Sequence, residues 1–137
     1  MGSISAEHDD DFRDRYVRSG APALIEAELE VLGSDYRANG YTTMGQADDL
    51  GRAIGLQIGD RLLDIGSGCG WPGLHLAARH GCAVVGIDPV REGGDVAAAR
   101  AARDGMADRH AVVTGNGDEL PFRSASFDAV VHTDVTC

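Results

Sequence analysis

The sequence predicts an α/β protein built on a doubly wound parallel sheet, with helices at its N-terminal end. Three observations favour this fold class. From about residue 60 onward, short apolar runs alternate with helical stretches, a glycine-rich segment follows the first run, and an acid ends the second. Such alternation is typical of a parallel sheet covered on both faces. We therefore expect a helical leader or cap segment over residues 1–57 and a sheet domain over residues 58–137.

The leader contains two predicted helices. Residues 1–20 are polar and charged without a sustained period, which predicts a frayed tail or a short helix. Residues 22–32 space their apolar side chains near a helical period, begin with a proline and are followed by a glycine, so they predict a helix. A second helix is expected over residues 46–56, because Asn39-Gly40 marks a turn and a threonine supplies a cap.

The sheet domain should contain strands and helices in strict alternation at first. Glycines at positions 93 and 94 weaken the start of the helix predicted over residues 92–104 by about 1 kcal/mol each relative to alanine. The predicted strands cover residues 61–65, 83–87, 111–114 and 127–132, and the predicted helices cover residues 71–80 and 92–104.

Composition excludes several kinds of partner. The chain has 137 residues, of which 43% are hydrophobic and 25% charged, as in ordinary globular proteins. Its net charge of −10 would repel a phosphate backbone, which argues against nucleic acid. The acidic N-terminus is unlike an export signal and no apolar run would span a membrane, so we expect a cytoplasmic protein. Cys69, Cys82 and Cys137 lack metal-site spacing and are expected to be reduced thiols, with no metal bound.

The strongest local signal is the segment LLDIGSGCG over residues 62–70, an apolar strand that runs into alternating glycines. Glycines allow a tight strand-to-helix reversal and let backbone amides approach a ligand that a Cβ would exclude. The following helix directs its free N–H groups at the same place, which favours a carboxylate there. Asp64 could receive an ammonium group, so the pair of charges fits an amino acid, such as the methionine portion of S-adenosylmethionine.

The glycine pattern alone does not decide between two ligands. Gly68, Gly70 and Gly73 also satisfy the G-x-G-x-x-G spacing of dinucleotide-binding domains. Asp64 favours the amino acid, because dinucleotide enzymes usually have an apolar residue there and a carboxylate would repel a pyrophosphate. An NAD(P)-binding dehydrogenase fragment therefore stays an alternative, as does a glycine-rich connection without a ligand.

A second acid stands about twenty residues further on, in the segment VVGIDP over residues 84–89. A carboxylate at the end of this strand can accept hydrogen bonds from both hydroxyls of a ribose. Asp88 therefore predicts a nucleoside site. The alternative is that Asp88 only caps the following helix, since aspartate before proline is a common turn signal.

The third motif is GNGDELPF over residues 115–122, followed by SFDAVVHTD over residues 126–134. With it, residues 61–134 resemble the class I S-adenosylmethionine-dependent methyltransferases, which have a Rossmann-like fold, and specifically the group similar to ubiquinone and menaquinone C-methyltransferases (methyltransferase type 11). That group carries G-D-A-x-x-L-P-F and S-F-D-x-V. The segment GYTT over residues 40–43 also looks like the leader of its small-molecule members.

The resemblance implies a cofactor site for S-adenosylmethionine and a small-molecule methyl acceptor. Asp64, Gly66, Gly68 and Gly70 would hold the methionine portion, Asp88 the ribose and Asp118 the adenine amino group. Glu119 would offer its backbone amide to the ring, and His132 and Thr133 would lie beside the methionine end. Tyr41 and Thr43 are candidates to cover the cofactor, with ordinary packing as the alternative. The full predicted set of cofactor-binding residues is Tyr41, Thr43, Asp64, Gly66, Ser67, Gly68, Gly70, Asp88, Pro89, Asp118, Glu119, His132 and Thr133.

One residue is a candidate for proton transfer. His132 is predicted at the carboxyl end of the fourth strand, where ligands of open α/β sheets bind, and histidine titrates near neutrality. It could remove a proton from a phenol, enol or amine acceptor. The alternative is an ordinary hydrogen bond at a strand end, and the remaining histidines are assigned no role.

The resemblance also implies three further strands after the fourth, whereas this sequence stops at Cys137. We therefore expect a truncated methyltransferase fold, with an unpaired fourth-strand edge that could drive self-association. The chain would then be an enzyme, or the cofactor-binding half of one, and the alternative is a truncated, non-catalytic cofactor-binding module.

Overall fold

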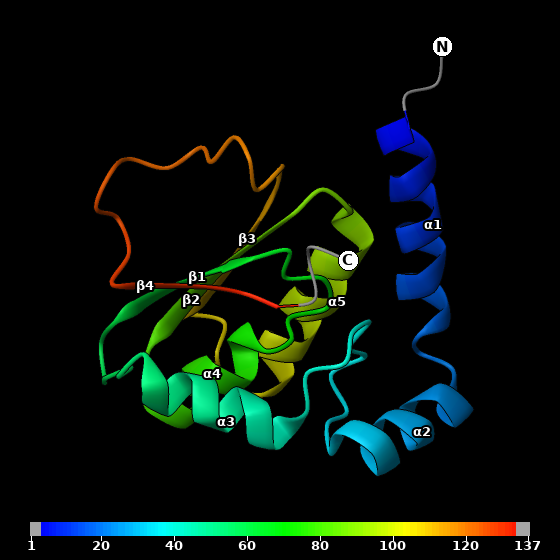
Figure 1. The fold of residues 1–137 in the computed structure, drawn as a ribbon, viewed down its shortest axis with the longest axis horizontal. Helices are drawn as coiled ribbons and strands as arrows, with labels where there is room; N and C mark the ends of the chain where they lie inside the picture. Colours follow the sequence, from blue (N-terminus) through cyan, green and yellow to red (C-terminus); the bar gives the residue numbers. More distant parts are fainter. Residues whose placement is uncertain (1–3, 134–137) are drawn as a thin grey trace.

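The structure is a computed structural model that describes residues 4–133 (Figure 1). Its leader holds three helices, α1 (Ile4–Arg18), α2 (Pro22–Leu32) and α3 (Met44–Ala53). The predicted helix over residues 22–32 is confirmed. The segment expected to be a frayed tail or short helix instead forms a helix of 15 residues.

Helix α3 begins and ends at identifiable local signals. Thr43 forms a capping box, in which its side chain accepts from the Gln46 amide and the Gln46 side chain accepts from the Thr43 amide. Gly55, at φ 68°, lies just beyond the end of the helix. A left-handed glycine ends a helix readily, so α3 stops at Ala53 and not at the predicted residue 56.

The sheet is parallel throughout and has the strand order β3-β2-β1-β4, which confirms the predicted fold class. Two crossover helices connect the first three strands, whereas a long loop without a helix leads to the fourth. The elements are β1 (Arg61–Ile65), α4 (Gly73–His80), β2 (Ala83–Asp88), α5 (Arg91–Arg103), β3 (His110–Thr114) and β4 (Ala129–His132).

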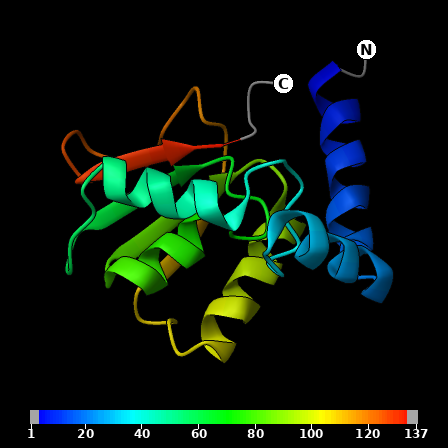
Figure 2. The same ribbon diagram turned by 60° about the horizontal axis from the view of Figure 1, so that its bottom comes forward.

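Helices α4 and α5 lie on the same face of the sheet (Figure 2). Both crossovers step in the same direction across the sheet, from β1 to β2 to β3. Because crossover connections between parallel strands share the same handedness, two crossovers in one direction place their helices on the same face of the sheet. The core beneath them includes Leu62, Leu76 and Val84, which are all almost completely buried. On the opposite face Val130 of β4 is 52% exposed.

The strand order creates a crevice above β1. The chain leaves β1 toward β2 on one side, and β4 joins β1 on the other, so the connections diverge at the carboxyl end of β1. Ligands of open α/β sheets bind at such a switch point. Helix α1 packs against α5 beside this edge, and α3 packs against α4 (Figure 1). Within residues 4–133 no helix is both long and apolar enough to cross a membrane.

Candidate cofactor-binding site

The loop from Gly66 to Gly70 has a backbone that only glycine adopts without strain. Gly66, Gly68 and Gly70 have φ values of 71°, 49° and 102°. The amides of Gly66 and Ser67 both donate to the carbonyl of Ile87, at 2.8 and 3.2 Å. The loop is therefore fixed to the end of the neighbouring strand β2.

Two further glycines permit close packing around the loop. A Cβ on Gly73 would lie 2.5 Å from Oδ2 of Asp64, and one on Gly86 would lie 2.5 Å from Oγ of Ser67. Both distances are shorter than real contacts allow. The absent side chains let Asp64 approach the first turn of α4 and let Ser67 approach β2.

Asp64 is buried, with only 1% of its surface exposed. Its Oδ2 accepts from the Gly73 amide at 3.0 Å, whereas no polar atom of residues 4–133 contacts its Oδ1. Burial raises the pKa of the Asp64 carboxyl to about 8, although the Gly73 hydrogen bond opposes this shift. The hydroxyl of Ser67 also lacks a partner within the described residues. Unpaired buried oxygens are costly, so this place suits a ligand that donates hydrogen bonds.

Asp88 uses both carboxylate oxygens within the protein. Its Oδ1 accepts from the Val90 amide at 2.9 Å, and its Oδ2 accepts from the Gly68 amide at 2.9 Å and from the Tyr16 hydroxyl at 3.4 Å. Burial raises the pKa of Asp88, and these hydrogen bonds oppose the rise. Asp88 therefore holds the turn that precedes α5, although the N-cap of that helix is Val90 and not Asp88 as the capping alternative supposed, and it also contacts the glycine loop and α1.

Two cavities meet at Gly66. The first, of about 50 Å³, lies between the glycine loop, α1 and residues 38–40, and Thr133 also lines it. The second, of about 440 Å³, is lined by Pro89, Asp118 and His132 among others. The first has room for a single charged group and the second is large enough for a ring system, so the pair suits a ligand that straddles Gly66.

The structure separates some residues that the sequence grouped. Thr133 lines the small cavity, whereas His132 lines the larger one together with Asp118. Asp118 and Glu119 are exposed, and the Glu119 amide donates to the Asn116 carbonyl at 3.4 Å.

The two proposed covering residues, Tyr41 and Thr43, do not line either cavity. Tyr41 is 83% exposed, and Thr43 caps α3.

The cysteines that the structure describes, Cys69 and Cys82, are free and buried, and Cys137 lies outside the described residues. Within residues 4–133 no cluster of His, Cys, Asp or Glu side chains is arranged to hold a metal ion.

Sequence reasoning missed the elements that cover the glycine loop. Tyr16 is buried, and its ring lies so close to Gly68 that a Cβ there would be 3.1 Å from the hydroxyl oxygen. Phe12, one turn earlier on α1, lines the small cavity with Tyr16, as do residues 38–40. The spacing of two aromatics at i and i+4 within an otherwise polar segment was the available signal.

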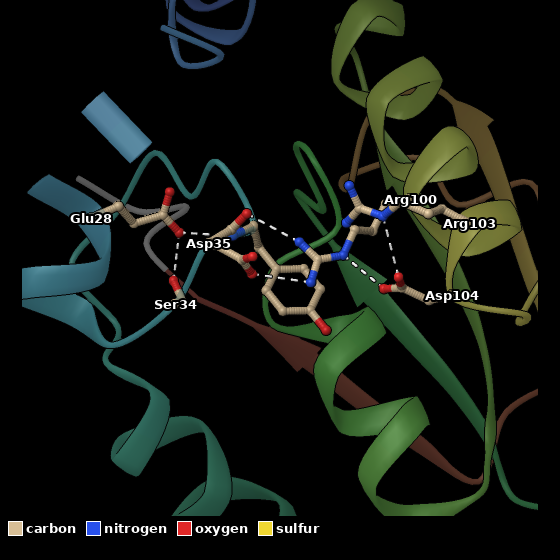
Figure 3. Close-up of polar contacts among 7 residues, drawn as sticks. Glu28, Ser34, Asp35, Arg100, Arg103 and Asp104 are labelled. Carbon is tan, nitrogen blue, oxygen red and sulfur yellow. Dashed lines mark hydrogen bonds and ion pairs between the residues drawn. The ribbon is translucent and has the colours of Figure 1, made fainter. Parts of the chain in front are cut away.

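A network of polar contacts holds residues 34–36 in place (Figure 3). Arg100 of α5 donates to the side chain and the carbonyl of Asp35, both at 3.0 Å, and to Asp104 at 2.7 Å. Its guanidinium also stacks over the ring of Tyr36, 3.8 Å from the centroid. On the other side the buried Glu28 accepts from the Ser34 hydroxyl and from the Tyr36 amide. The residues just before the segment that lines the small cavity are thus tied to α2 and to α5.

A histidine that the sequence left without a role has a structural contact. His75 of α4 lies 2.8 Å from Asp48 of α3, and its ring lies 5.3 Å from that of Trp71. The hydrogen bond from His75 is the main cause that lowers the pKa of Asp48. Trp71 in turn donates to the Thr42 carbonyl at 3.0 Å. These contacts join α3 and the segment before it to the start of α4.

Fold and site together define a class of protein. A parallel sheet with a glycine loop at its switch point, a buried acid beside that loop and a second acid at the end of β2 is typical of domains that bind a nucleoside with a charged tail.

Comparison with known proteins supplies the family. Residues 62–137 match the family described as methyltransferase domain, and the chain belongs to that family.

Curated relatives include three enzymes. The chain is 34% identical over 116 residues to erythromycin 3''-O-methyltransferase of Saccharopolyspora erythraea, which is 84% of this chain and 33% of the relative. It is 40% identical over 79 residues to 24-methylenesterol C-methyltransferase 2 of Oryza sativa subsp. japonica, covering 58% of the chain and 22% of the relative. It is 37% identical over 83 residues to 27-O-demethylrifamycin SV methyltransferase of Amycolatopsis mediterranei, covering 61% of the chain and 30% of the relative. The chain thus spans between about a fifth and a third of these relatives.

Solved structures share the fold. A methyltransferase from Geobacter sulfurreducens in complex with S-adenosyl-L-homocysteine has a TM-score of 0.65 at 27% identity, covering 80% of this chain and 44% of that one. A second such complex, from Thiobacillus denitrificans, has a TM-score of 0.61 at 28% identity, covering 77% of this chain and 42% of that one.

Proposed function

We propose that this chain binds S-adenosylmethionine and forms the cofactor-binding part of a methyltransferase that acts on a small molecule. The observation that carries the proposal is the buried Asp64 beside a glycine loop and the first turn of α4, whose Oδ1 has no hydrogen-bond partner in the part of the chain that the structure describes. An amino-acid ammonium would satisfy this oxygen. The cofactor supplies an activated methyl group, so the protein's task is alignment and exclusion of water.

The residues divide the proposed ligand into three parts. Asp64 and the glycine loop, with Ser67, would hold the methionine end, and the amides at the start of α4 would favour its carboxylate. Asp88 would accept from the ribose, with Pro89 beside it. A ribose hydroxyl would take the place of the weak 3.4 Å contact from Tyr16. The larger cavity would take the adenine, with Asp118 and Glu119 at its edge.

We also propose that residues 1–57 act as a cap over residues 58–137. The position of Tyr16 and Phe12 over the glycine loop supports this division. The capping segment would exclude water from the methionine end of the cofactor.

Relatives named for a sterol, erythromycin and a rifamycin support a small-molecule acceptor. The net charge of −10 supports a protein that binds no nucleic acid, and we propose a cytoplasmic protein that does not bind membranes.

Calorimetric titration with S-adenosylhomocysteine tests the proposal, with NADH titrated in parallel. We expect S-adenosylhomocysteine to bind and NADH not to bind. Asp88→Ala should weaken binding by about 1–3 kcal/mol, the usual cost of losing a charge-assisted hydrogen bond. Binding of NADH alone would favour the dehydrogenase alternative, and an unchanged affinity in Asp88→Ala would mean that Asp88 serves only the turn into α5.

Transfer of a labelled methyl group separates an enzyme from a non-catalytic binding module. If the cofactor binds but no acceptor in a screen becomes labelled, the binding module is favoured. Where an acceptor is found, His132→Gln tests the predicted proton transfer, which requires the acceptor to reach from the small cavity past Gly66 to the cavity that His132 lines. Loss of turnover at unchanged affinity for S-adenosylhomocysteine would support it, and unchanged turnover would reduce His132 to a strand-end side chain.

A further inference from the structure

A third cavity, of about 470 Å³, lies between the end of α1, one side of α2 and residues 38–41. It is separate from the two cavities at Gly66. Its size lies within the range of small-molecule sites, about 300–1,000 Å³.

The wall from α2 is apolar although it faces solvent. Leu24, Ala27 and Val31 line the cavity at the spacing of a single helix face, and all three are exposed. Val31 is 72% exposed, and the exposed Tyr41 also lines the cavity. Contiguous exposed apolar side chains of this kind mark a binding surface more often than isolated ones do.

The cavity adjoins the proposed methionine end of the cofactor. Ala38, Asn39 and Gly40 line both this cavity and the small cavity above the glycine loop. One short segment therefore forms a common wall. A molecule held against α2 would lie next to the place where the methionine end of the cofactor is proposed to bind.

The charges at the cavity are unlike those of the chain as a whole. Arg15 and Arg18 from the last turn of α1 line it, in a protein with a net charge of −10. Arg15 pairs with the exposed Asp11 at 2.7 Å, a contact that water screens, and Arg18 donates to the Asp14 carbonyl at 3.3 Å. Glu28 also lines the cavity, but its carboxylate already accepts from Ser34 and from the Tyr36 amide.

We propose that this cavity is the acceptor subsite and that it takes a largely apolar small molecule carrying an anionic group. The apolar body would lie on Leu24, Ala27 and Val31, and the anion would face Arg15 and Arg18. That this ligand is the methyl acceptor rests on the proposed function, whereas the chemistry of the ligand rests on the cavity alone.

Two fluorescent probes of the same skeleton test the ligand chemistry. The first, 8-anilinonaphthalene-1-sulfonate, carries an anion, and the second, N-phenyl-1-naphthylamine, does not. We expect the native protein to bind both, with tighter binding of the sulfonate. The double variant Arg15→Gln/Arg18→Gln should lose about tenfold in affinity for the sulfonate and keep its affinity for the neutral probe.

Matched variants keep the test specific. Val31→Asp should abolish binding of both probes, and because Val31 is exposed the fold should survive, as circular dichroism would verify. Arg52→Gln, which removes an exposed arginine paired with Asp49 on α3, should change neither affinity. Equal loss of the sulfonate in Arg52→Gln would show a non-specific charge effect and overturn the proposal.

Saturating S-adenosylhomocysteine distinguishes this cavity from the cofactor site. Continued probe binding in its presence supports a separate subsite, and displacement of the probes would overturn it. Failure of S-adenosylhomocysteine to bind at all would refute the proposed function, whereas probe affinities unaffected by Val31→Asp would refute the cavity. The two failures are thus distinguishable.

Discussion

At the scale of single residues, Asp64 joins folding to the proposed chemistry. Its pKa of about 8 in the folded chain exceeds the ordinary value of 3.8, because burial disfavours the charged form. The folded state therefore holds the proton more tightly than the unfolded state. Below about pH 4 the protonated Asp64 makes its full contribution to the free energy of unfolding. As the pH rises from 4 toward 8 this contribution is lost, and the free energy of unfolding falls by at most ~1.4 kcal/mol per pH unit.

The variant Asp64→Asn should remove this pH dependence, since the amide cannot ionise and can still accept from Gly73. We expect the free energy of unfolding of the native chain, relative to that of the variant, to fall between pH 4 and pH 8. Urea denaturation across this pH range measures the difference. Parallel curves for the two proteins would contradict the burial of an ionisable Asp64.

Gly73 tests the close packing around the same acid. Gly73→Ala would place a Cβ 2.5 Å from Oδ2 of Asp64, so we expect a loss of about 1–3 kcal/mol in stability and weaker binding of S-adenosylhomocysteine. Gly45→Ala is the matched control. Its Cβ would meet only the Thr43 hydroxyl oxygen at 4.0 Å, and alanine favours helix by up to about 1 kcal/mol. Equal effects of the two substitutions on denaturation would contradict this account.

Sequence reasoning placed the two acids and the glycine loop because their positions follow from one strand and one turn. Asp64 and Asp88 stand at the ends of their strands, and the positive φ of the glycines follows from the reversal that the motif requires. Tyr16 was missed because its place over the loop depends on how α1 packs, which local pattern does not encode. The separation of His132 from Thr133 depends likewise on the alternation of side chains at the end of β4.

At the scale of elements, Arg100 connects α5 to Asp35 and Tyr36, just before the segment that lines the small cavity. Its side chain is 16% exposed and makes ion pairs with Asp35 and Asp104 in addition to stacking on Tyr36. We expect Arg100→Ala to cost about 1–3 kcal/mol in stability and to weaken binding of S-adenosylhomocysteine, because residues 35 and 36 lose this anchor beside the cavity wall formed by residues 38–40. Urea denaturation and calorimetry measure the two effects.

Arg103 provides the control on the same helix. Its side chain is 66% exposed and pairs with Asp104 at 3.3 Å, so Arg103→Ala should change stability by less than about 1 kcal/mol. If Arg100→Ala behaved like Arg103→Ala, the contacts of Figure 3 would contribute little to holding the segment.

The order and type of the elements could be predicted, whereas some boundaries could not. Strand β1 and helix α2 match their predicted ranges, because a sharp glycine or proline signal borders each. Helix α4 begins at Gly73 and not at residue 71, because the turn continues through residues 67–70, where the Gly70 amide bonds the Ser67 carbonyl. Strand β4 begins at Ala129 because pairing with β1, from Leu62 onward, defines it.

At the scale of the whole molecule, the unpaired side of β4 is the feature with a consequence for association. Within the described residues β4 pairs with β1 alone, and Val130 is 52% exposed. Exposed apolar edges promote pairing between chains. We propose self-association through this edge and expect Val130→Lys to reduce the concentration-dependent rise in mass seen by sedimentation velocity. An identical mass profile in both proteins would exclude this edge.

The overall class of fold followed from the alternation together with the glycine-rich segment and the acid after the second run, since apolar runs and helical stretches in turn leave few arrangements other than a parallel sheet. The side on which each helix packs required the strand order, and the order β3-β2-β1-β4 places α4 and α5 together on one face. The cavity beside α2 could not be predicted, because it depends on the angle at which the leader meets the sheet.

The central claim is that the glycine loop and Asp64 hold a zwitterionic tail attached to a nucleoside. A crystal structure of the chain with S-adenosylhomocysteine tests it most directly. We predict the ammonium within hydrogen-bond distance of Asp64, the carboxylate at the first turn of α4 and the ribose on Asp88. An empty loop under saturating ligand, or a diphosphate bound in its place from a dinucleotide, would contradict the account.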